Sequence, residues 1–404
     1  MSTIHVREVA SNLYLLRKDD GVTKFFEGIW EIPEGITYNA YLLLTDEGVA
    51  LIDGWKKEFS GEFISTIREL VDPKDIKLVV VNHAEPDHTG SLPAILKEAN
   101  DPLVVGHPMA KNLISTLQGV TPTFKPLKDG ERLSFGDETL RFVFTPWLHW
   151  PETIVTYLER RSVLLSCDVF GGYSIPQGVF DDEVGNVEEY MQYVRKYMVN
   201  VIGHYRDFVI KGLTKVESAG IKPAVIAPGH GLLWRRDVGR IVEEYKRWDR
   251  EVVSEGKVTV VYTSMYGYVE AAIKEVVSAL KEAGLKVVVH GFTDKARANL
   301  SDVLSDLDDS EAVVFGTATY EAGIFPLMRY VMMLLKEKMK GGKPAMVVTT
   351  YGWGDIAGRG VKAELEGTGF EVVSAVSVHG TLDPKTLEAL RDGVKALVAR
   401  LGKA

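Results

Sequence analysis

The 404-residue chain contains a single cysteine, Cys167. One cysteine cannot form an internal disulfide, a Cys-x-x-Cys redox pair or the thiolate ligand set of an iron–sulfur cluster. Cys167 lies in the apolar run SVLLSCDVF, where a buried and unreactive thiol is the expected role. Any redox chemistry of this chain therefore needs a cofactor that cysteine does not hold.

Long apolar runs and an excess of positive charge are also missing. No stretch approaches the roughly 20 apolar residues that a membrane-crossing helix needs, and the start MSTIHVREVA has no signal-peptide pattern. Lys and Arg number 47 against 56 Asp and Glu, so the net charge is −9. An acidic chain disfavours nucleic acid and anionic membranes as main partners. We therefore expect a soluble, cytoplasmic protein with no nucleic-acid or membrane partner.

The chain also lacks a GxGxxG fingerprint after a first strand, which argues against a dinucleotide-binding fold. Its length exceeds what one hydrophobic core usually serves. Short β-type runs with amphipathic helices among them fill the first part, and the pattern changes near residues 248–257. We expect two α/β domains, over residues 1–250 and 251–404.

In the second domain, strand and helix alternate strictly. The strands are KVTVVYT, LKVVVHGF, AVVFGTA, PAMVVTT and EVVSAVSV, with helices expected at 269–283, near 300, at 324–339, at 356–366 and from about 384. Five strands separated by helices predict a doubly wound, five-stranded parallel sheet.

Three loops at the carboxyl ends of these strands are the expected ligand site of such a sheet. The loop TSMYGYVE combines Ser, Thr and Gly with a helix N-terminus, which favours a phosphate. The loops GTATYEAG and YGWGD bring aromatic side chains that can flank a flat ring system. The candidate cofactor-binding residues are Thr263, Ser264, Met265, Tyr266, Gly267, Tyr268, Thr317, Ala318, Thr319, Tyr320, Tyr351, Gly352, Trp353 and Gly354.

In the first domain, the stretch VNHAEPDHTG places two histidines and two carboxylates within six positions, after an apolar run. Residues two apart on an extended strand end point the same way, so we expect His83 and Glu85 to share one metal. The turn at Pro86 would redirect Asp87 and His88 toward a second metal.

Three further candidates stand at the ends of later apolar runs: His149 in TPWLHWPET, Asp168 in LLSCDVFGG and His230 in IAPGHGLL. Together the seven side chains form a shell of four histidines and three carboxylates. The other histidines lack such surroundings, and we interpret them as structural or surface residues: His5, His107, His204, His290 and His379.

These two sets of motifs resemble known families. The C-terminal half resembles flavodoxin, which implies FMN as the ligand, although Tyr268 and Val269 stand where such sequences tend to have Asn and Thr. The N-terminal motif is similar to the H-x-H-x-D-H motif of the metallo-β-lactamase superfamily, with Glu85 in place of its second histidine. The combination resembles the A-type flavodiiron proteins, and this resemblance implies an N-terminal αββα sandwich.

The resemblance also implies ligand roles. His83, Glu85 and His149 would hold one iron, Asp87, His88 and His230 the other, and Asp168 would bridge the two ions. The carboxylate at position 85 favours iron over zinc, because neutral imidazole suits zinc whereas an anionic oxygen ligand suits iron. Three carboxylates bring −3 against the +4 of two ferrous ions, which leaves the site near neutrality.

The activity implied by the resemblance is reduction of O2 to water or of NO to N2O, with electrons passing through FMN to the two non-haem irons. Two metals about 3.5 to 4 Å apart can bind one small diatomic molecule between them. The expected partners are a rubredoxin-like electron donor and a second copy of the chain, in a head-to-tail homodimer or a dimer of such dimers. Tyr197 matches a tyrosine near the iron pocket of relatives, and either substrate hydrogen bonding or helix packing explains it.

Two other functions remain open at this level. One is a zinc-dependent hydrolase of the metallo-β-lactamase fold with a regulatory flavodoxin-like domain; Glu85 and the electron-transfer domain speak against it. The other is a flavodoxin-type electron carrier whose N-terminal domain docks a partner around a structural metal. The sequence does not decide between O2 and NO.

Overall fold

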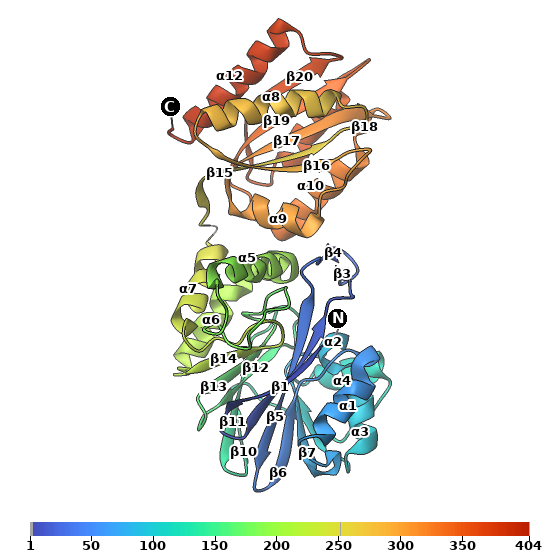
Figure 1. Ribbon diagram of the computed structural model, residues 1–404, viewed down its shortest axis with the longest axis vertical. Helices are drawn as coiled ribbons and strands as arrows, with labels where there is room; N and C mark the ends of the chain where they lie inside the picture. The colour runs from blue at the N-terminus through green and yellow to red at the C-terminus, as the bar shows by residue number, and fades with distance from the viewer. Residues whose placement is uncertain (1–2, 251, 404) are drawn as a thin grey trace. The chain divides into compact units, whose positions relative to one another are not determined.

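The computed structural model describes residues 3–250 and 252–403, and the chain divides into two compact units, Met1–Asp249 and Arg250–Ala404 (Figure 1). No helix among these described residues is long and apolar enough to span a membrane.

The N-terminal unit contains two sheets that pack face to face. The seven-stranded sheet has the order β1 (Ile4–Ala10), β2 (Leu13–Asp20), β5 (Ile36–Thr45), β6 (Gly48–Ile52), β7 (Ile76–Val81), β8 (Leu103–Gly106) and β9 (Phe124–Pro126). The five-stranded sheet has the order β10 (Arg132–Phe135), β11 (Glu138–Phe144), β12 (Ile154–Leu158), β13 (Val163–Cys167) and β14 (Val225–Pro228). Side chains such as Leu43, Leu78, Phe142 and Leu165 fill the space between the sheets.

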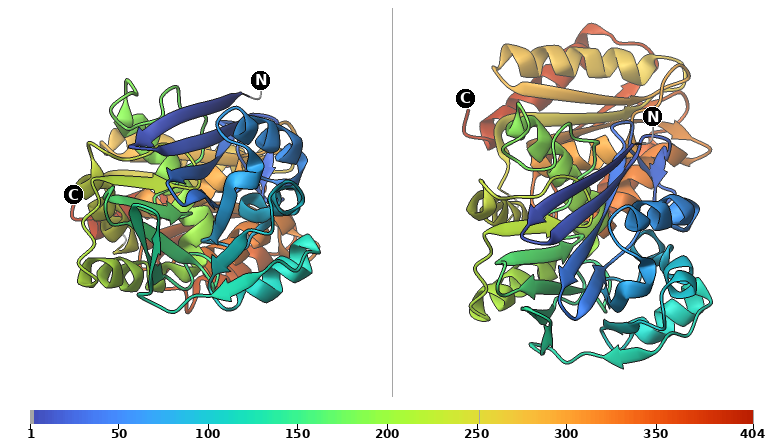
Figure 2. Two further views of the ribbon diagram at one scale, coloured as in Figure 1. Left: turned by 90° about the horizontal axis from the view of Figure 1, so that it is seen from below. Right: turned by 60° about the horizontal axis from the view of Figure 1, so that its bottom comes forward.

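Helices cover both outer faces of this sandwich (Figures 1 and 2). Figure 1 shows α1 (Ser60–Arg68), α3 (Leu92–Glu98) and α4 (Ala110–Gln118) on one side, and α6 (Val209–Ser218) and α7 (Val238–Asp249) on the other. The remaining elements are α2 (Pro86–Thr89), α5 (Val187–Tyr197), the π-helix Met198–Ile202, the short 3-10 helices at 57–59, 73–75 and 203–208, and a small hairpin of β3 (Phe25–Phe26) and β4 (Trp30–Glu31). The result is the αββα sandwich that the family resemblance implies, so the predicted fold class is confirmed for this unit.

The C-terminal unit has a parallel sheet with the order β16 (Lys286–Phe292), β15 (Ser254–Thr263), β17 (Ser310–Tyr320), β19 (Pro344–Tyr351) and β20 (Glu371–His379). The five predicted strands are confirmed, and their spatial order, 2-1-3-4-5, is that of flavodoxin-like folds. Figure 1 shows α8 (Tyr268–Glu282) and α12 (Pro384–Arg400) on one face, with α9 (Leu300–Asp309) and α10 (Pro326–Lys338) on the other. α11 (Ile356–Leu365) follows the loop after β19.

One short strand is an addition to the prediction. β18 (Gly323–Ile324) pairs antiparallel with the end of β17. Because β18 occupies these residues and Pro326 fits the first turn of a helix, α10 begins two residues later than the expected position 324.

Candidate metal centre and flavin loops

The seven predicted metal residues come from four segments that follow strands of the two sheets. His83 and Glu85 lie between β7 and α2, Asp87 and His88 lie on α2, His149 lies on the loop between β11 and β12, Asp168 follows β13, and His230 follows β14. The structure brings all seven together at one edge of the sandwich, although they span 148 positions of the sequence.

His83 and Glu85 do not occupy the strand end that the sequence predicts for them. β7 ends at Val81, so His83 and Glu85 do not stand on a strand and strand alternation does not orient them. Pro86 is the first residue of a one-turn helix, which ends the extended conformation at Glu85 and places Asp87 and His88 on that turn. The Nε2 atom of His83 still lies 3.1 Å from Oε2 of Glu85.

Asp168 lies between two groups of ligand atoms. Its Oδ2 atom is 3.6 Å from Nε2 of His83 and 3.8 Å from Nε2 of His149. Its Oδ1 atom is 3.1 Å from Nε2 of His88 and 3.4 Å from Nε2 of His230. One carboxylate therefore presents a different oxygen to each group.

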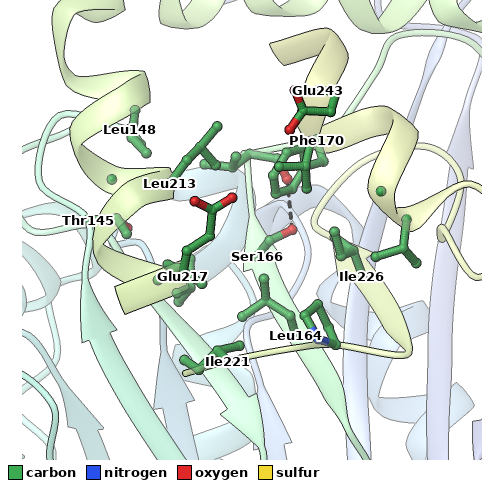
Figure 3. A pocket seen from close by; sticks show the side chains of 18 residues that line it. Thr145, Leu148, Leu164, Ser166, Phe170, Leu213, Glu217, Ile221, Ile226 and Glu243 are labelled. Carbon is green, nitrogen blue, oxygen red and sulfur yellow. Dashed lines mark hydrogen bonds between the residues drawn. The ribbon is translucent and has the colours of Figure 1, made fainter. Parts of the chain in front are cut away.

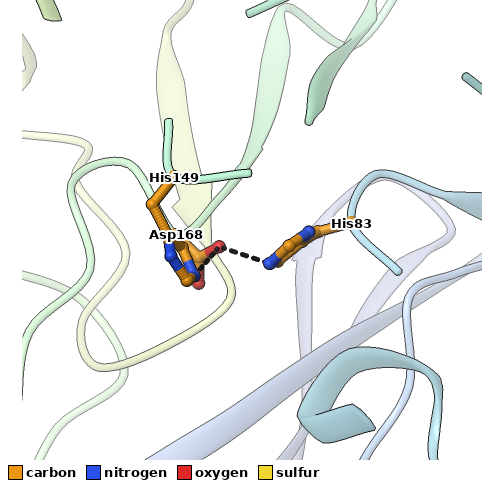
Figure 4. Close-up of side chains that lie close together, drawn as sticks. All are labelled: His83, His149 and Asp168. Atoms are coloured by element: carbon orange, nitrogen blue, oxygen red, sulfur yellow. Dashed lines mark ion pairs between the residues drawn. The ribbon is translucent and has the colours of Figure 1, made fainter. Parts of the chain in front are cut away.

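The first group is completed by Glu85, whose Oε2 atom lies 2.9 Å from Nε2 of His149. The side chains of His83, His149 and Asp168 point toward one another (Figure 4), and their ligand atoms lie within 4.8 Å of one another. Two imidazole nitrogens and two carboxylate oxygens converging in this way can hold one cation.

The second group consists of Asp87, His88 and His230, all buried, with ligand atoms within 4.8 Å of one another. Nε2 of His230 is 3.5 Å from Oδ2 of Asp87. Among the residues that the structure describes, neither oxygen of Asp87 nor Nε2 of His230 has a hydrogen-bond partner. Buried polar atoms left without partners are costly, and a cation between them would satisfy both at once. The donor set fits a metal.

Neighbouring carboxylates and imidazoles shift the pKa values of His83 and Asp168 toward the charged forms of both side chains. Burial lowers the pKa of His83, but its hydrogen bonds to Glu152 and Glu85 outweigh this effect, so the pKa is raised well above its ordinary value. Burial likewise raises the pKa of Asp168, but His88 and the other imidazoles outweigh it and hold the pKa well below its ordinary value. A metal that binds here replaces protons on the imidazoles, so its affinity rises with pH.

Two side-chain nitrogens of the histidines are fixed by partners that the sequence reasoning missed. Nδ1 of His83 lies 2.7 Å from Oε1 of the buried Glu152, and Nδ1 of His230 lies 2.7 Å from the carbonyl oxygen of Thr37. Each contact leaves Nε2 of its ring directed at the ligand group. For Glu152 a signal existed, because a carboxylate three residues after His149 belongs to the same segment, HWPET.

The backbone beside the ligands is strained. Trp147, two residues before His149, has φ 68°, and Cys167, directly before Asp168, has φ 51°. Residues other than glycine rarely adopt such angles, and they cluster at functional sites. Cys167 is buried, as expected, and burial raises the pKa of its thiol well above the ordinary value.

Tyr197 is the last residue of α5 and is fully buried. Its hydroxyl donates a hydrogen bond of 2.9 Å to Oδ1 of Asp168, and its ring lies 5.5 Å from that of His230. The π-helix that follows is a rare conformation that often accompanies functional sites. Phe26, Tyr38 and Tyr173 complete an aromatic wall around His230 and Tyr197 that the sequence did not reveal.

The predicted flavin residues lie at the carboxyl ends of β15, β17 and β19 and in the segments that follow β15 and β19. Four of them, Thr317 to Tyr320, were expected on a loop but belong to β17 itself. The switch point of the strand order lies between β15 and β17, where Oγ1 of Thr263 is 2.8 Å from Oγ1 of Thr317. The hydroxyl of Ser264 accepts a hydrogen bond from the amide of Gly267, whose positive φ of 87° turns the chain into α8. The first loop is thereby held at the start of a 15-residue helix.

Aromatic side chains of these loops face solvent. Tyr266 is 85% exposed and Trp353 is 70% exposed, and Tyr268 and Tyr320 are also exposed. Tyr351 stacks on His379 at 5.0 Å between ring centroids, and Nε2 of His379 lies 3.0 Å from the carbonyl oxygen of Gly352. Oγ1 of Thr319 accepts from the amides of Ile356 and Ala357, which ties the end of β17 to the start of α11. Exposed rings on ordered loops are suited to cover a flat ligand.

Comparison with known proteins agrees with this arrangement. Residues 36–231 match the family described as ODP family beta lactamase, and residues 260–393 match the flavodoxin family. A variant of the flavo di-iron protein from Thermotoga maritima is 40% identical, with a TM-score of 0.93 over 99% of each chain. The rubredoxin oxygen:oxidoreductase from Desulfovibrio gigas is 26% identical, with a TM-score of 0.93 over 98% of this chain and 99% of that one. The nitric oxide reductase of Moorella thermoacetica is 28% identical over 91% of each chain.

The flavodoxin domain implies a flavin, and the histidine and aspartate groups form a candidate two-metal site. Because 40% identity extends over 99% of both chains and both signatures stand in the same order, the chain belongs to the flavodiiron protein family.

Proposed function

We propose that this chain is a reductase that transfers electrons from an external donor, by way of FMN and two non-haem iron ions, to O2, NO or both, forming water or N2O. The observation that carries the proposal is the position of Asp168, whose two oxygens face two separate groups of ligand atoms. The similarity to a nitric oxide reductase and to a rubredoxin oxygen:oxidoreductase supports the same reaction class.

Iron is proposed because of the ligand chemistry. Two histidines and a glutamate, His83, His149 and Glu85, would hold one ion, while Asp87, His88 and His230 would hold the other. Asp168 would bridge them. The iron pair, when bound, would supply two redox-active ions that can reduce one small diatomic molecule between them. The two anionic carboxylates of the first group, Glu85 and Asp168, favour iron over zinc there.

The side chains around the metal residues have separable tasks in this proposal. Tyr197 stays protonated, since burial raises its pKa well above the ordinary value, and its hydroxyl is a donor at the inner face of the site. The hydrogen bond to Asp168 holds the Tyr197 hydroxyl in place. From this position the hydroxyl can turn and donate to an oxygen atom of a bound substrate. The rings of Phe26 and Tyr173 keep water away from the same face.

FMN is proposed as the flavin on account of the loop chemistry. The amides at the start of α8 and the hydroxyl groups of Thr263 and Ser264 suit a single phosphate, and Trp353 and Tyr320 suit the ring system. When bound, FMN supplies a carrier that takes electrons singly or in pairs.

An external donor completes the proposal. With one cysteine, the chain has no Cys-x-x-Cys pairs to hold a rubredoxin iron of its own. We therefore propose a rubredoxin-like protein as donor. The family resemblance further suggests a head-to-tail homodimer, or a dimer of such dimers, in which each flavin domain serves the partner's metal centre. Sedimentation velocity of the holoprotein tests this assembly.

The decisive experiment is anaerobic isolation, metal analysis and chemical reduction, followed by stopped-flow mixing with O2 and with NO separately. Rapid reoxidation of the flavin by at least one gas is expected, and a large difference in rate would identify the preferred substrate. Failure of both gases to reoxidise an iron-loaded protein would refute the proposal. Zinc without iron, together with ester hydrolysis, would support the hydrolase instead. Unchanged gas consumption after Asp168→Ala would favour an electron carrier.

A further inference from the structure

An apolar cavity of about 240 Å³ lies in the N-terminal unit, beneath α6 and α7 and against the outer face of the five-stranded sheet (Figure 3). It is lined mainly by aliphatic side chains, among them Leu148, Leu164, Leu213, Ile221, Ile226 and Val242. The metal residues do not contribute side chains to it. A cavity of about 150 Å³ lined by such side chains stays dry and takes up benzene or xenon, so this one is large enough for small apolar molecules.

The inner end of the cavity shares chain segments with the metal centre. Leu148 lines the cavity and directly precedes His149. Ser166 and Val169 also line it and stand on either side of Asp168. The hydroxyl of Ser166 donates to the carbonyl oxygen of Val169 at 2.7 Å, so this polar pair is satisfied internally (Figure 3). The lining of the cavity therefore includes residues that neighbour two of the candidate metal ligands along the chain.

The outer end opens between the two helices. Glu217 of α6 and Glu243 of α7 stand at this opening, and Nζ of Lys246 lies 2.9 and 2.8 Å from their carboxylates. The two helices are thus linked across a rim that carries two negative charges and one positive charge. Such a rim disfavours anions and offers no barrier to a small neutral molecule.

Leu148 is held at the inner end by close packing with α6. A methyl group added at Gly212 would lie 2.7 Å from Cδ1 of Leu148, so the helix leaves room for this side chain only because residue 212 is glycine. Leu148 is also the residue of the lining that stands nearest to His149 in the chain.

We propose that this cavity is a binding site for the neutral diatomic substrate, filled from solvent between α6 and α7 and emptied toward the metal centre past Leu148 and Val169. This inference rests on the proposed function, since it assigns O2 or NO as the occupant. Both gases are neutral and apolar enough to concentrate in an apolar space relative to water. The cavity would raise the local concentration of gas beside the segments that carry His149 and Asp168.

The test uses the holoprotein and three variants. Val242→Phe and the smaller Val242→Leu fill the cavity from α7, and Val6→Phe is the matched control on the exposed face of β1. Xenon density in crystals of the wild type under gas pressure is expected in the cavity, reduced in Val242→Leu and absent in Val242→Phe. Xenon reports on the cavity whether or not the protein is a reductase.

Capture of the substrate gas is measured by stopped flow with the reduced holoprotein. The second-order rate constant for NO or O2 is expected to fall at least fivefold in Val242→Phe and less in Val242→Leu. Turnover at saturating gas, iron content and FMN content should match the control. Absence of xenon from the wild-type cavity, or wild-type capture by a variant that excludes xenon, would overturn the inference alone. A wild type that consumes neither gas would overturn the proposed function, and this inference with it.

Discussion

The Nδ1 atom of His83 lies 2.7 Å from Oε1 of Glu152, and both side chains are inaccessible to solvent. The same oxygen accepts a hydrogen bond from the amide of Ala84. Glu152 therefore fixes both the ring and the backbone of the first histidine in the metal centre, and its charge makes the ring a stronger ligand.

Glu152→Gln tests this relationship, because glutamine keeps the shape and removes the charge. We expect metal affinity to fall by about 10- to 100-fold, the usual effect of losing such a partner. Competition with a chelator measures the affinity, and Glu159→Gln, which removes a partly exposed carboxylate paired with Arg132, is the control. Equal affinity in both variants would contradict a positioning role for Glu152.

Glu85→His places neutral imidazoles at both positions 83 and 85, where this chain has one imidazole and one carboxylate. The charge of the metal site becomes one unit more positive, and the ligand set becomes one that suits zinc. We expect a higher ratio of zinc to iron after expression in mixed-metal medium, and gas consumption reduced by about tenfold or more, equivalent to roughly 1.4 kcal/mol in the barrier. FMN content should not change. A variant with wild-type iron content and activity would show that Glu85 does not select the metal.

Trp353→Ala removes the most exposed large ring on the loop after β19. Loss of one stacking contact should weaken FMN binding by about 10-fold, from roughly 1 kcal/mol of aromatic interaction plus lost buried area. Fluorescence titration of the flavin-free protein measures this affinity. Val289→Ala, an exposed aliphatic change on β16, should leave it unaltered. If both variants bind FMN equally, the ring does not contact the flavin.

Asp306 on α9 offers a pH-dependent test of stability away from both sites. Burial alone would raise its pKa, but the hydrogen bond with His290 at 2.8 Å and the ion pair with Lys257 at 2.7 Å outweigh burial and lower it. A lowered native pKa gives stability that is present above the unfolded pKa, about 3.9, and lost as the pH falls through the native value.

We therefore expect Asp306→Asn to reduce the free energy of unfolding of the C-terminal unit by about 1 to 2 kcal/mol at pH 7. The difference in free energy of unfolding between the variant and the wild type should become smaller below about pH 4, because the wild-type carboxylate then takes up its proton. Urea unfolding followed by circular dichroism measures both values. Asp392→Asn removes an exposed carboxylate on α12 and is the control. A difference that does not depend on pH would assign the effect to packing.

Much of the metal centre could be predicted because its side chains stand at the ends of apolar strands. Strand ends are visible in the sequence, and neighbouring strands bring their ends to one edge, so the proximity of His149, Asp168 and His230 could be predicted without knowledge of the loops. The position of the candidate flavin segments at one edge of the sheet was predictable for the same reason, since the five-strand alternation determines which segments share an edge.

The missing features depend on loop conformation, which hydrophobic periodicity does not report. Glu152 reaches His83 only because the segment after His149 turns back toward β7, and His379 reaches Tyr351 only because β19 and β20 are parallel and in register. Strand alternation does not orient His83 and Glu85 because β7 ends at Val81, before either residue. Phe26 comes from a two-residue strand, which is too short to give a periodic signal.

In the proposed metal centre, the carboxylate of Asp168 shared by both ligand groups would make the binding of the two ions thermodynamically linked. A first ion that binds one oxygen fixes the rotamer of the side chain and so presents the other oxygen to the second group at a smaller entropic cost. Against this stands the repulsion between two cations that share one anion. Metal uptake by the apoprotein should therefore not follow two independent binding curves, and the sign of the deviation would reveal which of these opposing effects is larger.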